Sequence, residues 1–268
     1  MVKGKKSLII AIFIIALTVL TACGKDNKAV SLIEESSQNF KSVDSLETNI
    51  IIDALFERIN EFSEIKMKFE LENTTNPLAG HAYGSSSFNI GGLMTGGEVE
   101  IYQVNEEDQN VSYSRVNDTW IKEPWDSQTG FYGIKSEYLE PEDNSRKFVL
   151  KEDTSIINNQ ECFELSGYMS GENVMNIFDI TSVNDLAGIA TLDYESLNKA
   201  KIPFVISIYE STTLPAKIFI DMTDVLDEMY KETDENATVS KFTVAIEYDK
   251  YNNIDPIVVP EEVKRKIK

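Results

Sequence analysis

The stretch Glu64–Glu72, EIKMKFELE, decides the fold class predicted for this chain. Its apolar residues Ile65, Met67, Phe69 and Leu71 alternate strictly with lysines and glutamates. Successive side chains of a β-strand point to opposite faces, so the four apolar groups share one face and the charged groups share the other. A strand with one apolar and one wet face is typical of an antiparallel sheet that is covered on one side.

The same alternation returns near the C-terminus, in KFTVAIEYDKY at residues 241–251, where Phe242, Val244 and Ile246 share one face. Another apolar run, IPFVISIYES, occupies residues 202–211. Short turn-like segments such as Asn158-Asn159 separate many of these runs, as in antiparallel meanders. About ten strands are predicted, and the remaining ones occupy residues 45–55, 96–105, 110–117, 118–125, 146–153, 160–168 and 216–223.

A few helices are expected to cover the apolar face of this sheet. AVSLIEESSQNFKSVD at residues 29–44 places Val30, Ile33, Phe40 and Val43 near one helical face. Two further helical candidates occupy residues 171–199 and a short piece around residues 224–231. The predicted fold class is therefore α+β, with an antiparallel sheet and helical cover.

The glycine-rich run YGSSSFNIGGLMTGG at residues 83–97 is expected to form a strand and a flexible loop. Glycine costs about 1 kcal/mol inside a helix, which argues against a packed helix there. No internal repeat and no clear linker divides the rest of the chain. A single domain is the simpler interpretation.

The N-terminus has the three-part layout of a secretory signal. Three lysines precede the uncharged segment Leu8–Leu20, and small residues follow just before Cys23. The 13 residues of Leu8–Leu20 would extend only about 20 Å as a helix, at about 1.5 Å per residue, whereas a bilayer core is about 30 Å thick. A cleaved signal is therefore favoured over a permanent membrane span.

Leu20–Cys23, LTAC, resembles the lipobox of bacterial lipoproteins. That resemblance implies that the Cys23 thiol receives a diacylglyceryl group and becomes the first residue after cleavage. The predicted organisation is then a lipoprotein signal peptide at residues 1–22, a lipidated tether at 23–28 and a single ligand-binding domain at 29–268. An ordinary signal cut near Ala22, with Cys23 as a free thiol, is the alternative.

Charge and cysteine content narrow the function classes. The net charge is −20, and removal of a leader that carries three lysines and no acid would bring it to −23. Such a surface repels nucleic acid and anionic headgroups, so no nucleic-acid partner is expected. With Cys23 acylated, Cys162 is the one remaining thiol, no intrachain disulfide can form, and Cys162 is interpreted as a small buried hydrophobe.

The C-terminal half resembles lipoproteins of LolA-like fold, in Gram-positive bacteria and more distantly in mycobacteria. The resemblance rests on the strand IPFVISIYES, the Leu-Pro turn in TTLPAK, the return strand IFIDMTD and the segment FTVAIEYDKYNNIDPIVVPEEV. The hairpin VSYSRVNDTWIKEPW adds to it. In that family a strongly curved antiparallel sheet, an incomplete β-barrel, is closed by helices, and its apolar cavity holds acyl chains. The resemblance thus implies a lipid-handling lipoprotein on the outer face of a Gram-positive cytoplasmic membrane.

Residues suited to catalysis or metal binding are sparse. His81 is the single histidine, so a nucleophile would lack its usual base, and a zinc site would lack ligands. Ser196–Lys199 spells the S-x-x-K of penicillin-interacting enzymes without their other motifs. The acidic turns at residues 105–110 and 140–147 lack the spacing of a calcium loop. We expect no enzyme, no metal and no cofactor.

The apolar strand faces carry the remaining functional signal, as the walls of a ligand cavity or as ordinary core. Burial of a Leu or Phe contributes about 1.5 to 3 kcal/mol whichever group covers it, so the sequence does not separate the two. The leading hypothesis is a lipid, acyl-chain or lipoprotein ligand bound there, with Cys23 holding the protein to the membrane. The alternative is a scaffold with a closed core that engages an envelope protein partner. The cavity candidates are Ile65, Met67, Phe69, Phe204, Ile206, Ile208, Phe242, Val244 and Ile246.

Overall fold

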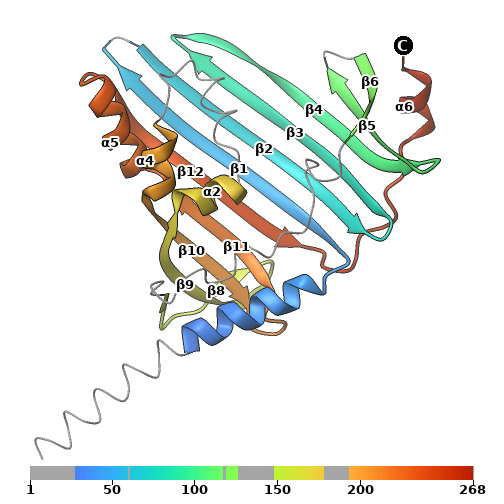
Figure 1. Ribbon diagram of the computed structural model, residues 1–268, viewed down its shortest axis with the longest axis horizontal. Helices are drawn as coiled ribbons and strands as arrows, with labels where there is room; N and C mark the ends of the chain where they lie inside the picture. The colour runs from blue at the N-terminus through green and yellow to red at the C-terminus, as the bar shows by residue number, and fades with distance from the viewer. Residues whose placement is uncertain (1–27, 60, 117–118, 126–147, 178–192, 268) are drawn as a thin grey trace, which may run out of the picture.

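In the part of the chain that the structure describes, twelve strands form a single antiparallel sheet, the body of the protein (Figure 1). The computed structural model describes residues 28–59, 61–116, 119–125, 148–177 and 193–267. The strands lie in the order β6-β5-β4-β3-β2-β1-β12-β11-β10-β9-β7, and β8 pairs with β9. Their bounds are β1 Ser45–Arg58, β2 Glu61–Thr75, β3 Leu78–Ile90, β4 Leu93–Glu106, β5 Gln109–Val116, β6 Thr119–Pro124, β7 Val149–Leu150, β8 Ser155–Ile157, β9 Gln160–Ser170, β10 Lys201–Tyr209, β11 Pro215–Asp221 and β12 Thr238–Asp249.

Strand register extends the alternation of β2 across the whole sheet. Ile65 lies opposite Ala54 of β1 and Phe88 of β3, and Ala54 lies opposite Phe242 of β12. We call the side of the sheet that carries these residues the inner face. The opposite side, which carries Lys66, is the outer face. The predicted antiparallel sheet with an apolar face is confirmed, with twelve strands in place of about ten.

Helices cover the inner face over β9 to β12. The helix at residues 28–41 crosses the lower ends of β10 and β11, and α2 and α4 lie in front of the sheet (Figure 1). α5 lies along β12. Their bounds are α2 Gly171–Ile177, α4 Tyr194–Lys199 and α5 Thr223–Thr233. The three predicted helical regions are thus confirmed where the structure describes them; residues 178–192 of the second region lie outside the described residues.

Aromatic side chains join this cover to the sheet. Tyr230 of α5 packs edge-on against Phe56 of β1, with 5.8 Å between ring centroids. Phe56 in turn meets Phe242 of β12 at 6.1 Å. Phe40 of the first helix packs against Tyr248 at 5.6 Å, also edge-on. Val30, which the sequence pattern placed on the buried side of this first helix, is 37% exposed, and Leu32 is buried in its place.

A second, smaller core forms on the outer face at the other end of the sheet. Tyr102, Val104 and Trp120 pack there against Val259 and Val263 of the C-terminal segment. Val263 belongs to α6 (Glu261–Arg265), which lies beside β5 and β6 (Figure 1). Neither α6 nor this core was predicted from the sequence, because a sheet with an apolar core on both faces was not expected.

The predicted strong curvature into an incomplete barrel is wrong, since the sheet is neither closed nor strongly curled. In a barrel the first and last strands pair, whereas the order of the described strands ends at β6 on one side and at β7 on the other. A barrel also has one inside. This sheet instead buries its inner face over β9 to β12 and on β1 and β2, and its outer face near β3 to β6, which an open, twisted sheet permits.

The glycine-rich run at residues 83–97 is paired strand along most of its length, so the predicted flexible loop there is wrong. β3 and β4 stay in register from Gly80 to Ile90, and only Gly91 and Gly92 form the turn, both with positive φ. Gly84 leaves room for a neighbour, because a Cβ there would lie 2.3 Å from the Phe69 ring. Glycine here serves close approach within a sheet.

One carboxylate joins the C-terminal helix to the sheet. Glu106 of β4 accepts hydrogen bonds from the Tyr113 hydroxyl at 2.7 Å and the Lys122 ammonium at 2.9 Å, and Lys264 of α6 lies 2.8 Å from it. Lys264, then Tyr113 and Lys122, lower the pKa of Glu106 from 4.5 to about 2. A lowered pKa in the folded state adds stability above pH 4.5 that is lost as the pH falls towards 2.

The Glu106→Gln variant is expected to lose about 1 kcal/mol of unfolding free energy at pH 7, after allowance for solvent screening. The difference from the parent protein should shrink as the pH falls from 4.5 to 2. Urea unfolding at pH 7, 4.5 and 3 measures it. Glu98→Gln is the control, because Glu98 is 60% exposed in its pair with Arg115. A difference that stays constant down to pH 3 would contradict the assignment.

Candidate functional site

The nine predicted cavity residues come from three strands, β2, β10 and β12, and lie together on the inner face. Register aligns Met67 with Ile52 of β1 and Val244 of β12, and Val244 with Ile220 of β11. Eight of the nine are at most 8% exposed, and Phe69 is partly buried against them. Sequence alternation therefore grouped them correctly, while their role as cavity walls stays a prediction. Cys23 lies outside the described residues.

An inner-face strip beside this core is less completely covered. Phe69, Leu71, Ala82, Ile50 and Ile101 form a separate small apolar cluster on β1 to β4. Three of the five, Phe69, Ile50 and Ile101, are partly exposed although they face the covered side. We call this cluster, together with Val99, the inner strip.

Val99 completes the inner strip on β4. It lies opposite Gly84, is partly exposed, and is followed towards the hairpin by exposed Gly97 and Thr95 on the same face. Solvent therefore reaches apolar side chains from the β4 side. Five residues of the inner strip were not among the predicted cavity residues: Ile50, Leu71, Ala82, Val99 and Ile101. Leu71 shares the alternation of Phe69, whereas the other four lie on β1, β3 and β4. Only the register of β1, β3 and β4 against β2 identifies them.

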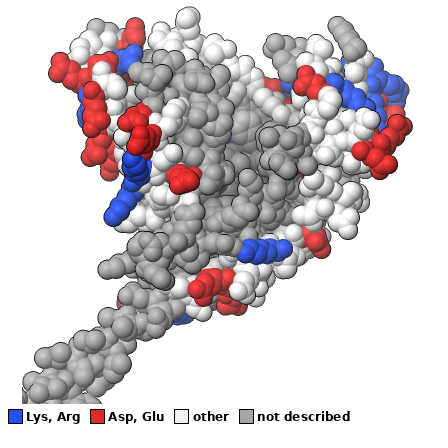
Figure 2. Space-filling view, viewed as in Figure 1, with Lys and Arg blue, Asp and Glu red and all other residues white. Residues whose placement is uncertain are grey.

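The inner strip lies in an uncharged part of the sheet. Across β1 to β5, the described inner-face positions between the level of Asn73 and the level of Met67 include no Lys, Arg, Asp or Glu. Figure 2 shows acidic side chains gathered over α5 at one margin and charges of both signs near α6 at the other. Apolar contact and hydrogen bonding are thus the interactions that this surface offers.

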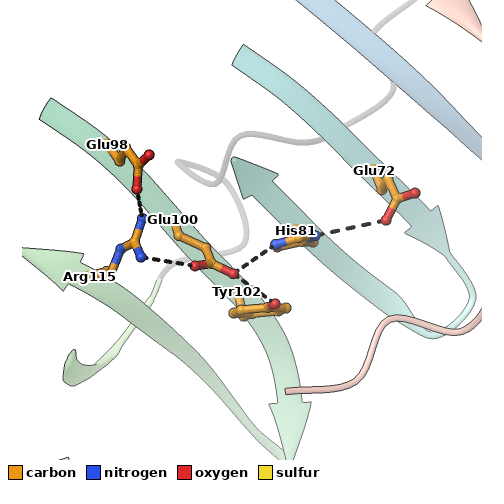
Figure 3. A network of polar contacts seen from close by, with 6 residues as sticks. All are labelled: Glu72, His81, Glu98, Glu100, Tyr102 and Arg115. Carbon is orange, nitrogen blue, oxygen red and sulfur yellow. Dashed lines mark hydrogen bonds and ion pairs between the residues drawn. The ribbon is translucent and has the colours of Figure 1, made fainter. Parts of the chain in front are cut away.

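His81 lies on the outer face, in a polar network that joins the four neighbouring strands β2 to β5 (Figure 3). Its Nε2 lies 3.5 Å from Glu100 of β4, and its Nδ1 lies 3.8 Å from Glu72 of β2. The ring stacks on Tyr102 at 4.2 Å between centroids. Burial, and the hydrogen bond that the Tyr102 hydroxyl donates to Glu100, raise the pKa of Tyr102.

This network suits cross-strand support better than catalysis. The labelled residues around His81 are carboxylates, a tyrosine and Arg115, which pairs with Glu98 at 2.9 Å; none is a serine or cysteine nucleophile (Figure 3). The two carboxylates face opposite nitrogens of the ring, so no single ion could bind all three groups. Within the described residues no group of three metal-ligating side chains could hold a metal ion.

The other chemical candidates have structural roles. The Ser196 hydroxyl donates to Asp193 at 2.6 Å, and Asp193 caps the N-terminus of α4, so the S-x-x-K match is part of a helix cap. Lys199 pairs with Glu195 at 2.6 Å. Cys162 is fully buried, as predicted, and burial raises the pKa of its thiol. None of these residues points to a reaction.

No helix among residues 28–267 that the structure describes is long and apolar enough to cross a membrane.

Comparison with known proteins supports the fold. LprF from Mycobacterium bovis has a similar structure, with a TM-score of 0.52 at 12% identity, covering 88% of this chain and 97% of LprF. The lipoprotein LppX from Mycobacterium tuberculosis gives a TM-score of 0.43 at 14% identity, covering 88% and 100%. The predicted resemblance to LolA-like lipoproteins is thereby confirmed for the fold.

No curated protein sequence matches the chain. The model of a family of unknown function, DUF6612, matches residues 28–268.

Proposed function

Because this chain belongs to the DUF6612 family, whose function is unknown, we propose a role from its own geometry: it is a non-enzymatic lipoprotein that binds an apolar or amphipathic ligand on the inner strip. The observation that carries the proposal is the partial exposure of Phe69, Ile50 and Ile101 beside the buried core of the same face. Small-molecule sites in proteins are usually lined by apolar side chains that are partly exposed in a concave or covered surface. Acyl chains match its lack of charge.

The architecture on which the proposal is built is shared with a known structure. LprF shares the fold of this chain, with a TM-score of 0.52 at 12% identity. One fold hosts many functions, so the argument rests on the inner strip, and the comparison only supports it. A lipid or acyl chain would bury the three partly exposed side chains and gain roughly 25 cal/mol for each Å² of apolar surface removed from water.

Two measurements test ligand binding. Native mass spectrometry of the mature domain, purified without detergent, should show bound mass in the range of a lipid. A fluorescent acyl probe should bind saturably with a stoichiometry near one. Absence of both would sink the proposal.

We further propose that Cys23 carries the membrane anchor, which places the protein on the outer face of the cytoplasmic membrane of a Gram-positive cell. Two acyl chains hold a protein at a bilayer, whereas one chain does so only marginally. In the full-length chain expressed in a Gram-positive host, Cys23→Ser should move the protein from the membrane fraction to the medium or to an unprocessed precursor. Unchanged, fully processed membrane protein would contradict lipidation.

A scaffold with a closed core is the second candidate. Eight of the nine predicted cavity residues are at most 8% exposed. This burial favours the scaffold, because a core filled by its own side chains leaves no room for a ligand. Under this alternative the acidic exterior would engage an envelope protein partner. Saturable probe binding that responds to substitution in the inner strip would exclude it.

A further inference from the structure

The inner strip ends in a row of uncharged polar residues near the β2–β3 and β4–β5 turns. Asn73 of β2 lies opposite Gly80 of β3, Gly80 opposite Gln103 of β4, and Gln103 opposite Ser112 of β5. We call these four residues the polar row. They share the inner face with Leu71 and its neighbours, which lie one inward position along each strand.

Two side chains of the polar row are buried without a partner. Asn73 is 6% exposed and Gln103 is 9% exposed. The Asn73 Oδ1 and Gln103 Oε1 atoms are each buried and accept no hydrogen bond. A buried acceptor without a partner is costly, and native proteins keep few of them. β3 lies between their two strands, and its residue at this level is Gly80, which has no side chain. The Cα atoms of Asn73 and Gln103 are therefore about 10 Å apart, with only a glycine between them.

Charge around the polar row selects a neutral group. No cation lies among its inner-face neighbours on β1 to β5, so a phosphate or carboxylate would find no counter-ion. Beyond the polar row, Glu123 of β6 lies opposite Ser112 and would repel an anion. An uncharged hydroxyl suits the site, since it donates to one amide oxygen and accepts from an amide NH₂ or from Ser112.

We propose that the polar row binds the uncharged, hydroxyl-bearing headgroup of an amphipathic ligand whose acyl part lies on the inner strip. This inference rests on the proposed function and adds the headgroup chemistry and the orientation of the ligand. The headgroup points to the β2–β3 and β4–β5 turns, and the chain extends towards Gly84 and Met67. The two orphan amide oxygens gain hydrogen bonds when it binds.

Three probes share one acyl chain and differ in the headgroup, so together they separate the contribution of the headgroup from that of the acyl chain. They are 1-monooleoylglycerol, methyl oleate and oleate. Each displaces a fluorescent acyl probe from the mature domain. The parent protein should bind monooleoylglycerol about tenfold more tightly than methyl oleate, because one or two added hydrogen bonds contribute a factor of that size, and oleate should bind weakest.

The double variant Asn73→Leu/Gln103→Leu removes both amides. It should bind monooleoylglycerol and methyl oleate equally, with methyl oleate affinity unchanged. Replacement of unpaired buried polar groups by apolar ones does not destabilise the fold, so thermal unfolding should stay at the parent midpoint or above it. Asn89→Leu is the matched control, because Asn89 also has a buried, unpartnered oxygen but lies on the outer face.

The outcomes distinguish the two proposals. Equal affinity of the parent protein for all three probes, or preference for oleate, overturns the polar row while ligand binding stands. A double variant that keeps the tenfold preference, or an Asn89→Leu variant that loses it, also overturns it. Binding of no probe at all removes the proposed function and this inference together.

Discussion

The Val99→Trp variant is expected to bind a fluorescent acyl probe at least tenfold more weakly than the parent protein. Val99 lies on the inner face opposite Gly84 and is partly exposed. An indole added there would lie beside the Phe69 ring, which fills the space next to Gly84, and would occupy the surface that the proposed ligand needs. The ligand would lose an apolar contact about as large as one buried aromatic side chain, which contributes about 1.5 to 3 kcal/mol. That loss corresponds to a roughly ten- to hundredfold weaker affinity.

Glu98→Trp is the matched control for this experiment. Glu98 is the preceding residue of β4 and faces the opposite side, where it is 60% exposed in its pair with Arg115. The same indole there should leave probe affinity unchanged. Probe titration of both variants, with circular dichroism to check the fold, gives the answer. Equal affinity of the two variants would place the ligand away from the inner strip.

The Phe242→Ala variant is expected to lose about 3 to 5 kcal/mol of unfolding free energy. Phe242 is 1% exposed in the centre of the main core and packs edge-on against Phe56, which itself meets Tyr230 of α5. Truncation removes these contacts and leaves a cavity between β12 and its helical cover. For a domain of this size, each kcal/mol shifts the melting temperature by about 2 to 4 °C.

Phe219→Ala on β11 is the control for packing. Phe219 points to the outer face and is 36% exposed, so its loss should cost less than 1 kcal/mol. Urea unfolding of both variants measures the difference. A cost below about 1 kcal/mol for Phe242→Ala would mean that this part of the inner face is loosely filled, and would extend the proposed ligand space into the main core.

Local pattern was enough to predict the strands of this protein. Alternation in β2 and β12 follows from one apolar and one wet face, and each strand carries that signal in its own residues. The turns at Asn158-Asn159 and at Glu107-Asp108 also follow from local chemistry, because asparagine and aspartate tolerate the positive φ observed there. The glycine-rich run is an exception, because glycine there permits close contacts between neighbouring strands, and sequence spacing does not reveal those contacts.

The candidate site was predictable only in part. Phe69 was identified from its place in a strict alternation, and it does lie in the inner strip. Val99 and Gln103 gave no such signal, since their importance depends on Gly84 and Gly80 of the neighbouring strand. The polar row in particular combines residues from four strands, and no single strand contains a motif for it.

The sequence by itself determined that this chain forms an antiparallel sheet with an apolar face and a few covering helices, because side-chain periodicity is a property of each segment alone. Tertiary structure decided that the sheet stays open, that α6 covers its outer face at the opposite end, and that the inner strip and the polar row adjoin. Those features depend on which strands pair and in which register, and register is a relation between distant segments.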